Sequence, residues 1–160
     1  MRRKPNVPFK IAHPAHFLAL GFGSGLMPWL PGTFGTLAAL PVYLLMTPLA
    51  WPYYLGLTAA LFVLGIFLCD KTARDARVHD HPAIVWDEIV GYLVTMLWAP
   101  LDWRWMLAGF LLFRLFDMAK PWPISLLDRY VKGGFGIMVD DLLAGVFALA
   151  ALQLLIFWLG

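Results

Sequence analysis

The chain has 160 residues, of which 61% are hydrophobic and only 14% charged, and its mean hydropathy is +0.74. Soluble domains are about 45–50% apolar and about 25% charged. This composition excludes a disordered chain and disfavours a soluble domain, because the polar surface is too small to cover a globule. The length suits one domain, residues 1–160. The single cysteine, Cys69, excludes a disulfide framework, and a net charge of +2 does not indicate a nucleic-acid partner.

The first apolar stretch, Phe17–Leu30, is rich in glycine and proline, and Pro31–Thr36 adds more of both. Glycine and proline at this density disfavour one regular helix. Irregular backbone is tolerated at membrane depth only against protein or a wet cavity. We therefore expect a re-entrant or interfacial segment here.

Five apolar segments follow, and a transmembrane helix needs about 17–25 such residues. Two have that length without a charge, Trp51–Cys69 and Leu142–Gly160. Three further candidates are less regular. Thr33–Leu49 is interrupted by two prolines. Ile89–Leu101 reaches a usable length when it is extended back through Ala83–Trp86, and Trp105–Phe113 continues to Lys120. The pattern predicts an all-α membrane protein, a polytopic helical bundle of about five spans.

Positive charge is concentrated on one side of these spans. The N-terminus, residues 70–87 and residues 121–141 share that side and, with Lys120 at the border, hold ten of the twelve lysines and arginines. The other side has only Arg104. The positive-inside rule places the N-terminus in the cytoplasm and the C-terminus outside. Nine of the ten acidic residues lie on the cytoplasmic side too.

Two pairs of adjacent acids stand at cytoplasmic ends of predicted spans. One exposed acid would compensate a helix dipole, but Asp87 and Glu88 together, within a mostly apolar helix, are costly unless paired or bound to a cation. Asp140 and Asp141 begin the last span after a glycine-rich turn, Gly133–Gly136. One of that pair could simply be an N-cap. If the two pairs meet, four carboxylates share one site.

Arg114, Asp117 and Lys120 recur every three residues and form one stripe of a helix. An ion-pair ladder explains the spacing, but not why a span keeps three charges. We expect Asp117 to support a metal, and Arg114 and Lys120 to bind an anion. Thr33 and Thr36, each after a glycine, could add hydroxyl and N–H donors at a helix start, although a tight turn explains the glycines equally well.

Clustered carboxylates suit a hard cation such as Mg²⁺, which is usually held by one or two carboxylates and a substrate phosphate. Other phosphatase chemistries lack their motifs, because Arg74 is one place too close to Cys69 for a cysteine phosphatase and no zinc or P-loop spacing occurs. Metal-assisted attack by water remains, with His79, Asp80 or Glu88 as the general base.

Several motifs carry a family resemblance. In chain order they are Gly21–Gly25 (GFGSG), Pro31–Thr36 (PGTFGT), His79–His81 (HDH), Ile84–Gly91 (IVWDEIVG), Phe113–Ile124 (FRLFDMAKPWPI) and Gly133–Gly145 (GGFGIMVDDLLAG). Together they resemble the bacterial phosphatidylglycerophosphatase A family over nearly the whole chain. The resemblance implies a Mg²⁺-dependent inner-membrane enzyme that hydrolyses phosphatidylglycerophosphate to phosphatidylglycerol and inorganic phosphate.

The same motifs implicate Asp80, Asp87, Glu88, Asp117, Lys120, Asp140 and Asp141. We expect the site at the cytoplasmic end of the bundle, with the bilayer and a phospholipid substrate as partners and the oligomeric state open. The expected Mg²⁺ ligands are Asp87, Glu88, Asp140 and Asp141, with Asp117 in support. The expected phosphate-binding residues are Arg114, Lys120, Thr33 and Thr36. The expected catalytic residues are Asp87 and Glu88 with His79 or Asp80, which would assist proton transfer.

Two other classes of protein stay open. In a small cation transporter or channel the intramembrane acids would line an ion path, but the Trp51–Cys69 span offers few polar groups besides Thr58 and its tyrosines. In a membrane scaffold the acids would be pure cost, and neutralising them would stabilise the fold.

Overall fold

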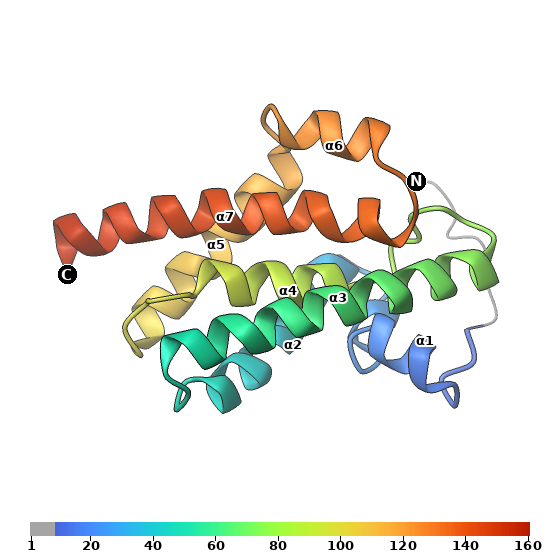
Figure 1. The fold of residues 1–160 in the computed structure, drawn as a ribbon, viewed down its shortest axis with the longest axis horizontal. Coiled ribbons are helices and arrows are strands. Elements are labelled where there is room, and N and C mark those ends of the chain that lie inside the picture. Colours follow the sequence, from blue (N-terminus) through green and yellow to red (C-terminus); the bar gives the residue numbers. More distant parts are fainter. Residues whose placement is uncertain (1–8) are drawn as a thin grey trace.

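A computed structural model describes residues 9–160, and this part of the chain is helical and contains no strand (Figure 1). The basic residues at positions 2–4 lie outside the described residues. The helices, in order, are α1 (Pro14–Ala19), the 3₁₀ helix η1 (Ser24–Leu26), α2 (Pro31–Met46), α3 (Trp51–Ala76), α4 (Trp86–Thr95), α5 (Trp103–Ala119), α6 (Ile124–Tyr130) and α7 (Gly133–Leu159). The predicted all-α fold is confirmed.

Two helices, α3 and α7, are long and apolar enough to cross a membrane. They run in opposite directions along the long axis of the molecule (Figure 1). Both exceed their predicted lengths. Beyond Cys69, α3 continues for two turns of charged residues joined by ion pairs four residues apart, Asp70 with Arg74 and Lys71 with Asp75. These pairs keep the end of α3 polar.

The other three candidate spans form shorter helices. The 16 residues of α2, 10 of α4 and 17 of α5 correspond to about 24, 15 and 26 Å at 1.5 Å per residue, against a hydrocarbon core of about 30 Å. α2 continues through Pro41, although this proline was expected to interrupt the segment. Only two of the predicted five segments therefore have full spanning length.

The shortest of these, α4, is the central helix. It packs against α2, α3, α5 and α7, and eight of its ten residues are buried. Two tyrosine hydroxyl groups connect α4 to its neighbours. Tyr92 of α4 donates to the backbone carbonyl of Met106 in α5 (3.0 Å), and Tyr54 of α3 donates to that of Leu93 in α4 (2.6 Å). The apolar sequence of α4 therefore reflects burial in protein rather than contact with lipid.

The Gly/Pro-rich segment is irregular, as expected. α1 and η1 are separated by residues with positive φ, Gly21 (58°), Phe22 (59°) and Gly23 (92°). The backbone N–H of Val85 donates to the carbonyl of Ala19 (2.9 Å), which fixes the segment to the loop before α4. The segment thus packs against the start of α4.

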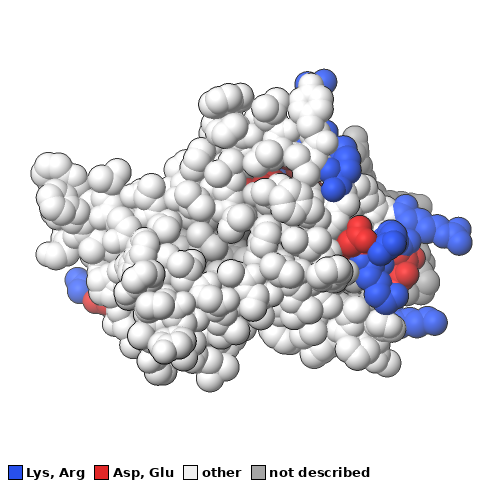
Figure 2. Space-filling view, viewed as in Figure 1, with Lys and Arg blue, Asp and Glu red and all other residues white. Residues whose placement is uncertain are grey.

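Charged side chains gather at one end of the molecule. On the face in Figure 2, Lys, Arg, Asp and Glu cluster where α3 ends and α7 begins, and most of the remaining surface is uncharged. The opposite end carries one small charged group. There α5 begins with Asp102, which caps the helix and pairs with Arg104 (2.8 Å).

α4 and α7 approach most closely through two glycines. A Cβ on Gly145 would lie 2.6 Å from the carbonyl oxygen of Gly91, and a Cβ on Gly91 would lie 2.4 Å from the ring of Phe113. Real Cβ atoms do not approach that closely, so α7 can lie against Gly91 only because Gly145 has no side chain, and Phe113 of α5 can lie against α4 only because Gly91 has none. This contact sets the distance between the residues that α4 and α7 carry.

Gly145→Ala should destabilise the protein by about 1–3 kcal/mol, because the added methyl group must push α7 away from α4. Gly56→Ala is the matched control, since a Cβ at Gly56 of α3 meets nothing within 4 Å. This substitution should stabilise the helix by about 0.5–1 kcal/mol. Thermal unfolding in detergent micelles measures both. Equal stability of the two variants would contradict the close approach.

Candidate active site

Three carboxylates from two helices meet inside the bundle. Asp87 and Glu88 occupy the first turn of α4, and Asp141 lies in the third turn of α7. One oxygen of each lies within 4.8 Å of the others. The convergence of the two acidic segments, which the sequence only suggested, is therefore present.

Asp140 and Asp141 do not cap a helix. α7 begins at Gly133, so both acids are well inside it, and the predicted turn at Gly133–Gly136 is its first turn. The glycines there allow close packing, since a Cβ on Gly134 would lie 2.0 Å from the carbonyl oxygen of Ile66 in α3. The N-cap interpretation is wrong, and a capping role does not explain the pair.

The three clustered carboxylates are incompletely paired. Asp87 Oδ1, Glu88 Oε2 and Asp141 Oδ2 are buried and have no hydrogen-bond partner among the described residues. An unpartnered buried carboxylate oxygen is costly. Three carboxylates at this separation, each with an unpartnered oxygen, suit a hard cation with oxygen ligands, such as Mg²⁺. The donor set therefore fits the expected metal.

Arg114 stands beside the carboxylates. Its guanidinium bonds to Asp117 one turn along α5, and its Nη1 lies 4.0 Å from Glu88 Oε1. Its Nε is buried and has no acceptor within residues 9–160. The predicted Arg114–Asp117 pairing is present, and one N–H donor is left for another anion.

Lys120 departs from the predicted stripe. It ends α5 with a left-handed backbone (φ 44°), and its Nζ donates to Asp128 of α6 (2.7 Å) and Asp140 of α7 (3.1 Å). Burial opposes its charge, but the hydrogen bonds and charges of these two acids outweigh burial and raise the pKa of the Lys120 ammonium. Burial acts to raise the pKa of Asp128, but its bond to Lys120 prevails and lowers it. Lys120 therefore links three helices.

These groups surround a polar cavity of about 240 Å³. Its lining residues are Pro31, Gly32, Asp80, Pro82, Ile84, Asp87, Glu88, Arg114, Asp117, Lys120, Asp140 and Asp141. A second polar cavity, of about 220 Å³, adjoins it through Asp80 and Asp140 and also contains His79, Asp128 and Lys132. The cavity takes its residues from α2, α4, α5, α7 and the loop before α4.

The remaining predicted residues take different places. Asp80 lines both cavities; the residue is exposed overall, yet burial of its carboxyl raises the pKa of that group. His79 lines only the second cavity, and its Nε2 accepts from the N–H of Gly133 (2.9 Å). Thr33 and Thr36 are not among the lining residues, and the buried Thr36 hydroxyl donates to the carbonyl of Gly32 (2.9 Å). The threonine hydroxyls are thus kept out of the site.

Pro31 and Gly32 of that segment line the cavity, and charged side chains lie against Gly32. A Cβ there would lie 2.7 Å from Glu88 Oε1 and 3.0 Å from Arg114 Nη1. A larger residue at this position would have to displace the Glu88 carboxylate or the Arg114 guanidinium. The start of α2 also directs the positive end of a helix dipole toward the cavity.

The sequence profile of phosphatidylglycerophosphatase A matches residues 17–156, which is most of the chain. This chain belongs to the phosphatidylglycerophosphatase A family. The predicted resemblance is confirmed, and membership makes the chain a phosphatase, a phosphoric monoester hydrolase. All the residues that line the polar cavity fall within the matched range.

Two similar proteins carry the name phosphatidylglycerophosphatase A, and a third carries another name. The chain is 52% identical to phosphatidylglycerophosphatase A of Escherichia coli over 138 residues, covering 86% of this chain and 80% of that protein. Identity to the Haemophilus influenzae protein of the same name is 45% over 159 residues, 96% and 98% of the two chains. A putative phosphatidylinositol-3-phosphatase of Bacteroides thetaiotaomicron is 39% identical over 144 residues, 82% and 86% of the two chains. No solved structure matches the chain.

Sequence reasoning missed Asp128 as a partner of the site. Asp128 looks like an ordinary loop acid, because nothing local connects it to Lys120. Only the reversal between α5 and α6 brings the two residues together. The prolines at positions 121 and 123, which end α5, were the available signal.

Asp141→Asn should stabilise the metal-free protein by about 0.5–2 kcal/mol, because it removes one of three crowded negative charges while keeping the shape of the side chain. The measurement is thermal unfolding in detergent at pH 8 with a chelator. Asp102→Asn, at the exposed start of α5, should change stability by less than about 0.5 kcal/mol. A less stable Asp141→Asn protein would show that the cluster is not electrostatically crowded.

Proposed function

We propose that this member of the phosphatidylglycerophosphatase A family hydrolyses phosphatidylglycerophosphate to phosphatidylglycerol and inorganic phosphate, with Mg²⁺ as cofactor. The observation that carries the proposal is the meeting of Asp87, Glu88 and Asp141 beside Arg114 in one polar cavity. Metal-assisted hydrolysis of a phosphate monoester needs acidic groups that bind the cation and a basic group that binds the phosphate.

The residues that would hold Mg²⁺ are Asp87, Glu88 and Asp141, with Asp117 next to them through Arg114. When bound, Mg²⁺ neutralises charge on phosphate oxygens and lowers the pKa of water. Asp140, a predicted ligand, bonds instead to Lys120. In our proposal it positions Lys120 and, through the 3.0 Å bond from the Asp141 N–H to its Oδ1, its neighbour.

The substrate phosphate lies, in our proposal, against Arg114. The unpartnered Nε donates to one phosphate oxygen, and a charge-assisted bond of this kind is stronger than a neutral one. The start of α2 contributes the backbone N–H of Gly32 and the positive end of the helix dipole, since the N–H groups of Thr33 and Phe34 donate to the carbonyl of Leu30. Lys120, which also lines the cavity, adds positive charge there.

Proton transfer falls to Asp80. The attacking water loses a proton, and the departing phosphatidylglycerol oxygen gains one. Asp80 lines the polar cavity and has a raised pKa, which suits a group that exchanges protons. His79 is next to it and reaches only the second cavity, so it supports Asp80 rather than contacting substrate.

We further propose a multi-pass inner-membrane protein with its N-terminus and active site at the cytoplasmic face. The polar cavity contains the start of α2, the start of α4, the end of α5 and the early turns of α7, and Asp70 near the end of α3 accepts from the N–H of Gly134. The five helices thus alternate in direction. This path supports five membrane segments, in which α3 and α7 cross fully and shorter helices pack around α4.

The opposite end carries interfacial aromatic residues. Trp51, the first residue of α3, and Trp98, after α4, have ring centroids 6.0 Å apart, and both are exposed. Tryptophan is enriched where a membrane meets water. This pair supports placing that end at the outer surface.

Purified protein should release phosphate from phosphatidylglycerophosphate only with Mg²⁺ present. Asp87→Asn and Asp141→Asn should each lower the rate by at least about 10²–10³-fold and should lose the Mg²⁺-induced rise in Tm. Asp102→Asn should keep both. Full activity in both cavity variants would remove them from the site, and faster hydrolysis of phosphatidylinositol-3-phosphate would change the proposed substrate.

The orientation is tested with single cysteines, since the natural Cys69 is fully buried. A membrane-impermeant maleimide should label Leu101→Cys in intact spheroplasts, and should label Arg129→Cys in α6 only after permeabilisation. Both positions are exposed. The reverse pattern would invert the proposed topology.

A further inference from the structure

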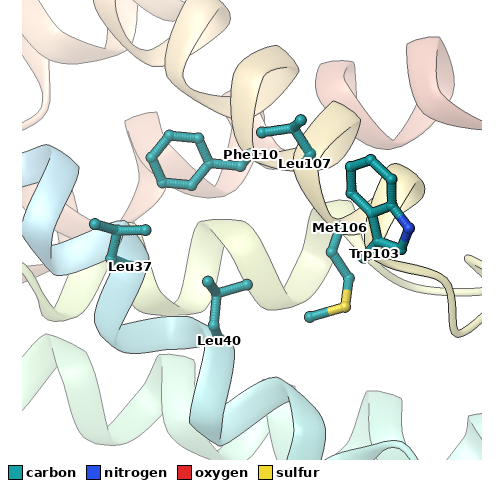
Figure 3. Close-up of a pocket in the computed structure, with 6 residues that line it drawn as sticks. All are labelled: Leu37, Leu40, Trp103, Met106, Leu107 and Phe110. Atoms are coloured by element: carbon teal, nitrogen blue, oxygen red, sulfur yellow. The ribbon is translucent and has the colours of Figure 1, made fainter.

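An apolar groove of about 270 Å³ lies between α2 and α5. Figure 3 shows side chains of the two helices facing one another across it. The lining residues are Leu37 and Leu40 of α2 and Trp103, Met106, Leu107 and Phe110 of α5. Apart from the indole nitrogen of Trp103, this lining is hydrocarbon or thioether, so the groove suits a ligand without polar groups.

The groove begins where the polar cavity ends. Gly32 precedes Leu37 by five residues on α2, and Arg114 follows Phe110 by four on α5. Both Gly32 and Arg114 line the polar cavity, and a Cβ on the glycine would lie 3.0 Å from Arg114 Nη1. Leu37 and Phe110 lie together at one end of the groove, and Trp103 at the other (Figure 3). One pair of helices therefore forms the walls of both sites.

The groove opens sideways to the surrounding solvent. α2 and α5 both pack on α4 and make few contacts with each other. Leu37, Leu107 and Trp103 are 42%, 50% and 71% exposed, whereas Leu40, Met106 and Phe110 are half-buried. The exposed residues would face lipid in a membrane.

The distance from Arg114 to the far end of the groove matches one leaflet. Arg114 lies eleven positions after Trp103 on α5, about 16 Å along the helix at 1.5 Å per residue. Half of a hydrocarbon core of about 30 Å is about 15 Å. A chain attached to a headgroup at Arg114 would follow α5 from the polar cavity toward the bilayer centre.

We propose that the α2–α5 groove binds an acyl chain of the phospholipid whose terminal phosphate is bound at Arg114. The inference rests on the function proposed above. Charge favours this wall, since Arg114, which would bind the anionic phosphate, stands on α5 itself. A smaller apolar hollow between α3, α4 and α7, lined by Leu55 and Phe62 among others, adjoins no cation, and we assign it no chain.

Leu37→Trp and Leu107→Trp test the groove from its two walls, and both positions are exposed enough to accept the larger ring. Each variant should lower kcat/KM for long-chain phosphatidylglycerophosphate in mixed micelles about tenfold, the effect of losing about two buried methylene groups. The loss should appear in KM. Activity on a dihexanoyl analogue with the same headgroup should stay within about twofold.

Two controls carry the same added ring elsewhere. Leu45→Trp lies on α2 outside the groove and is 81% exposed, and Leu55→Trp fills the other apolar hollow. Neither should change the ratio of long-chain to short-chain activity. Equal losses on both substrates in the groove variants, or the same chain-length effect in Leu55→Trp, would overturn the proposal.

A measurement independent of turnover separates this inference from the proposed function. A phosphatidylglycerophosphate analogue with a diazirine in one acyl chain should crosslink to α2 and α5, and unlabelled analogue should compete better than phosphatidylcholine. Crosslinking spread evenly over α3 and α7 would overturn the groove. Absence of phosphate release from every lipid, with crosslinking still at α2 and α5, would overturn the enzymatic function and leave the acyl-chain site standing.

Discussion

Three carboxylates that share an apolar bundle impose the main constraint on this structure. Asp87 and Glu88 begin the most buried helix of the described chain, and Asp141 faces them from α7. Such a group costs stability unless a cation or a proton compensates its charge. The glycine contact between α4 and α7, the ion pair of Arg114 and the close start of α2 all serve to hold these charges at one place and to bring basic groups beside them.

The second shared feature is the way Lys120 joins three helices. Its bonds to Asp128 and Asp140 fix the end of α5 to α6 and α7, so the same lysine that adds positive charge to the cavity also closes one of its sides. Neighbouring polar cavities meet at Asp80 and Asp140. The second polar cavity shares no lining residue with the α2–α5 groove, so water and released phosphate would have a polar route separate from it.

Much of the site could be predicted from the sequence, because ionisable groups in an apolar segment are rare and costly. This property singled out Asp87, Glu88, Arg114 and Asp141. Helix lengths did not follow, because hydropathy does not distinguish lipid from protein as the apolar surroundings. α4 reads like part of a span but is buried by its neighbours. Two further features depend on tertiary geometry and leave no local sequence pattern. They are the bond of Lys120 to Asp128 and the hydrogen bond of the Thr36 hydroxyl to the backbone of Gly32.

The start of α2 sets the width of the site. At Gly32 the chain leaves out a side chain between a carboxylate and a guanidinium, where even one methyl group would lie 2.7 Å from Glu88 Oε1. In the proposed complex, the backbone of α2 would therefore stand beside the substrate near the point where its headgroup meets its acyl chains. A substitution at Gly32 would alter the fit of the lipid without removing any charge from the site.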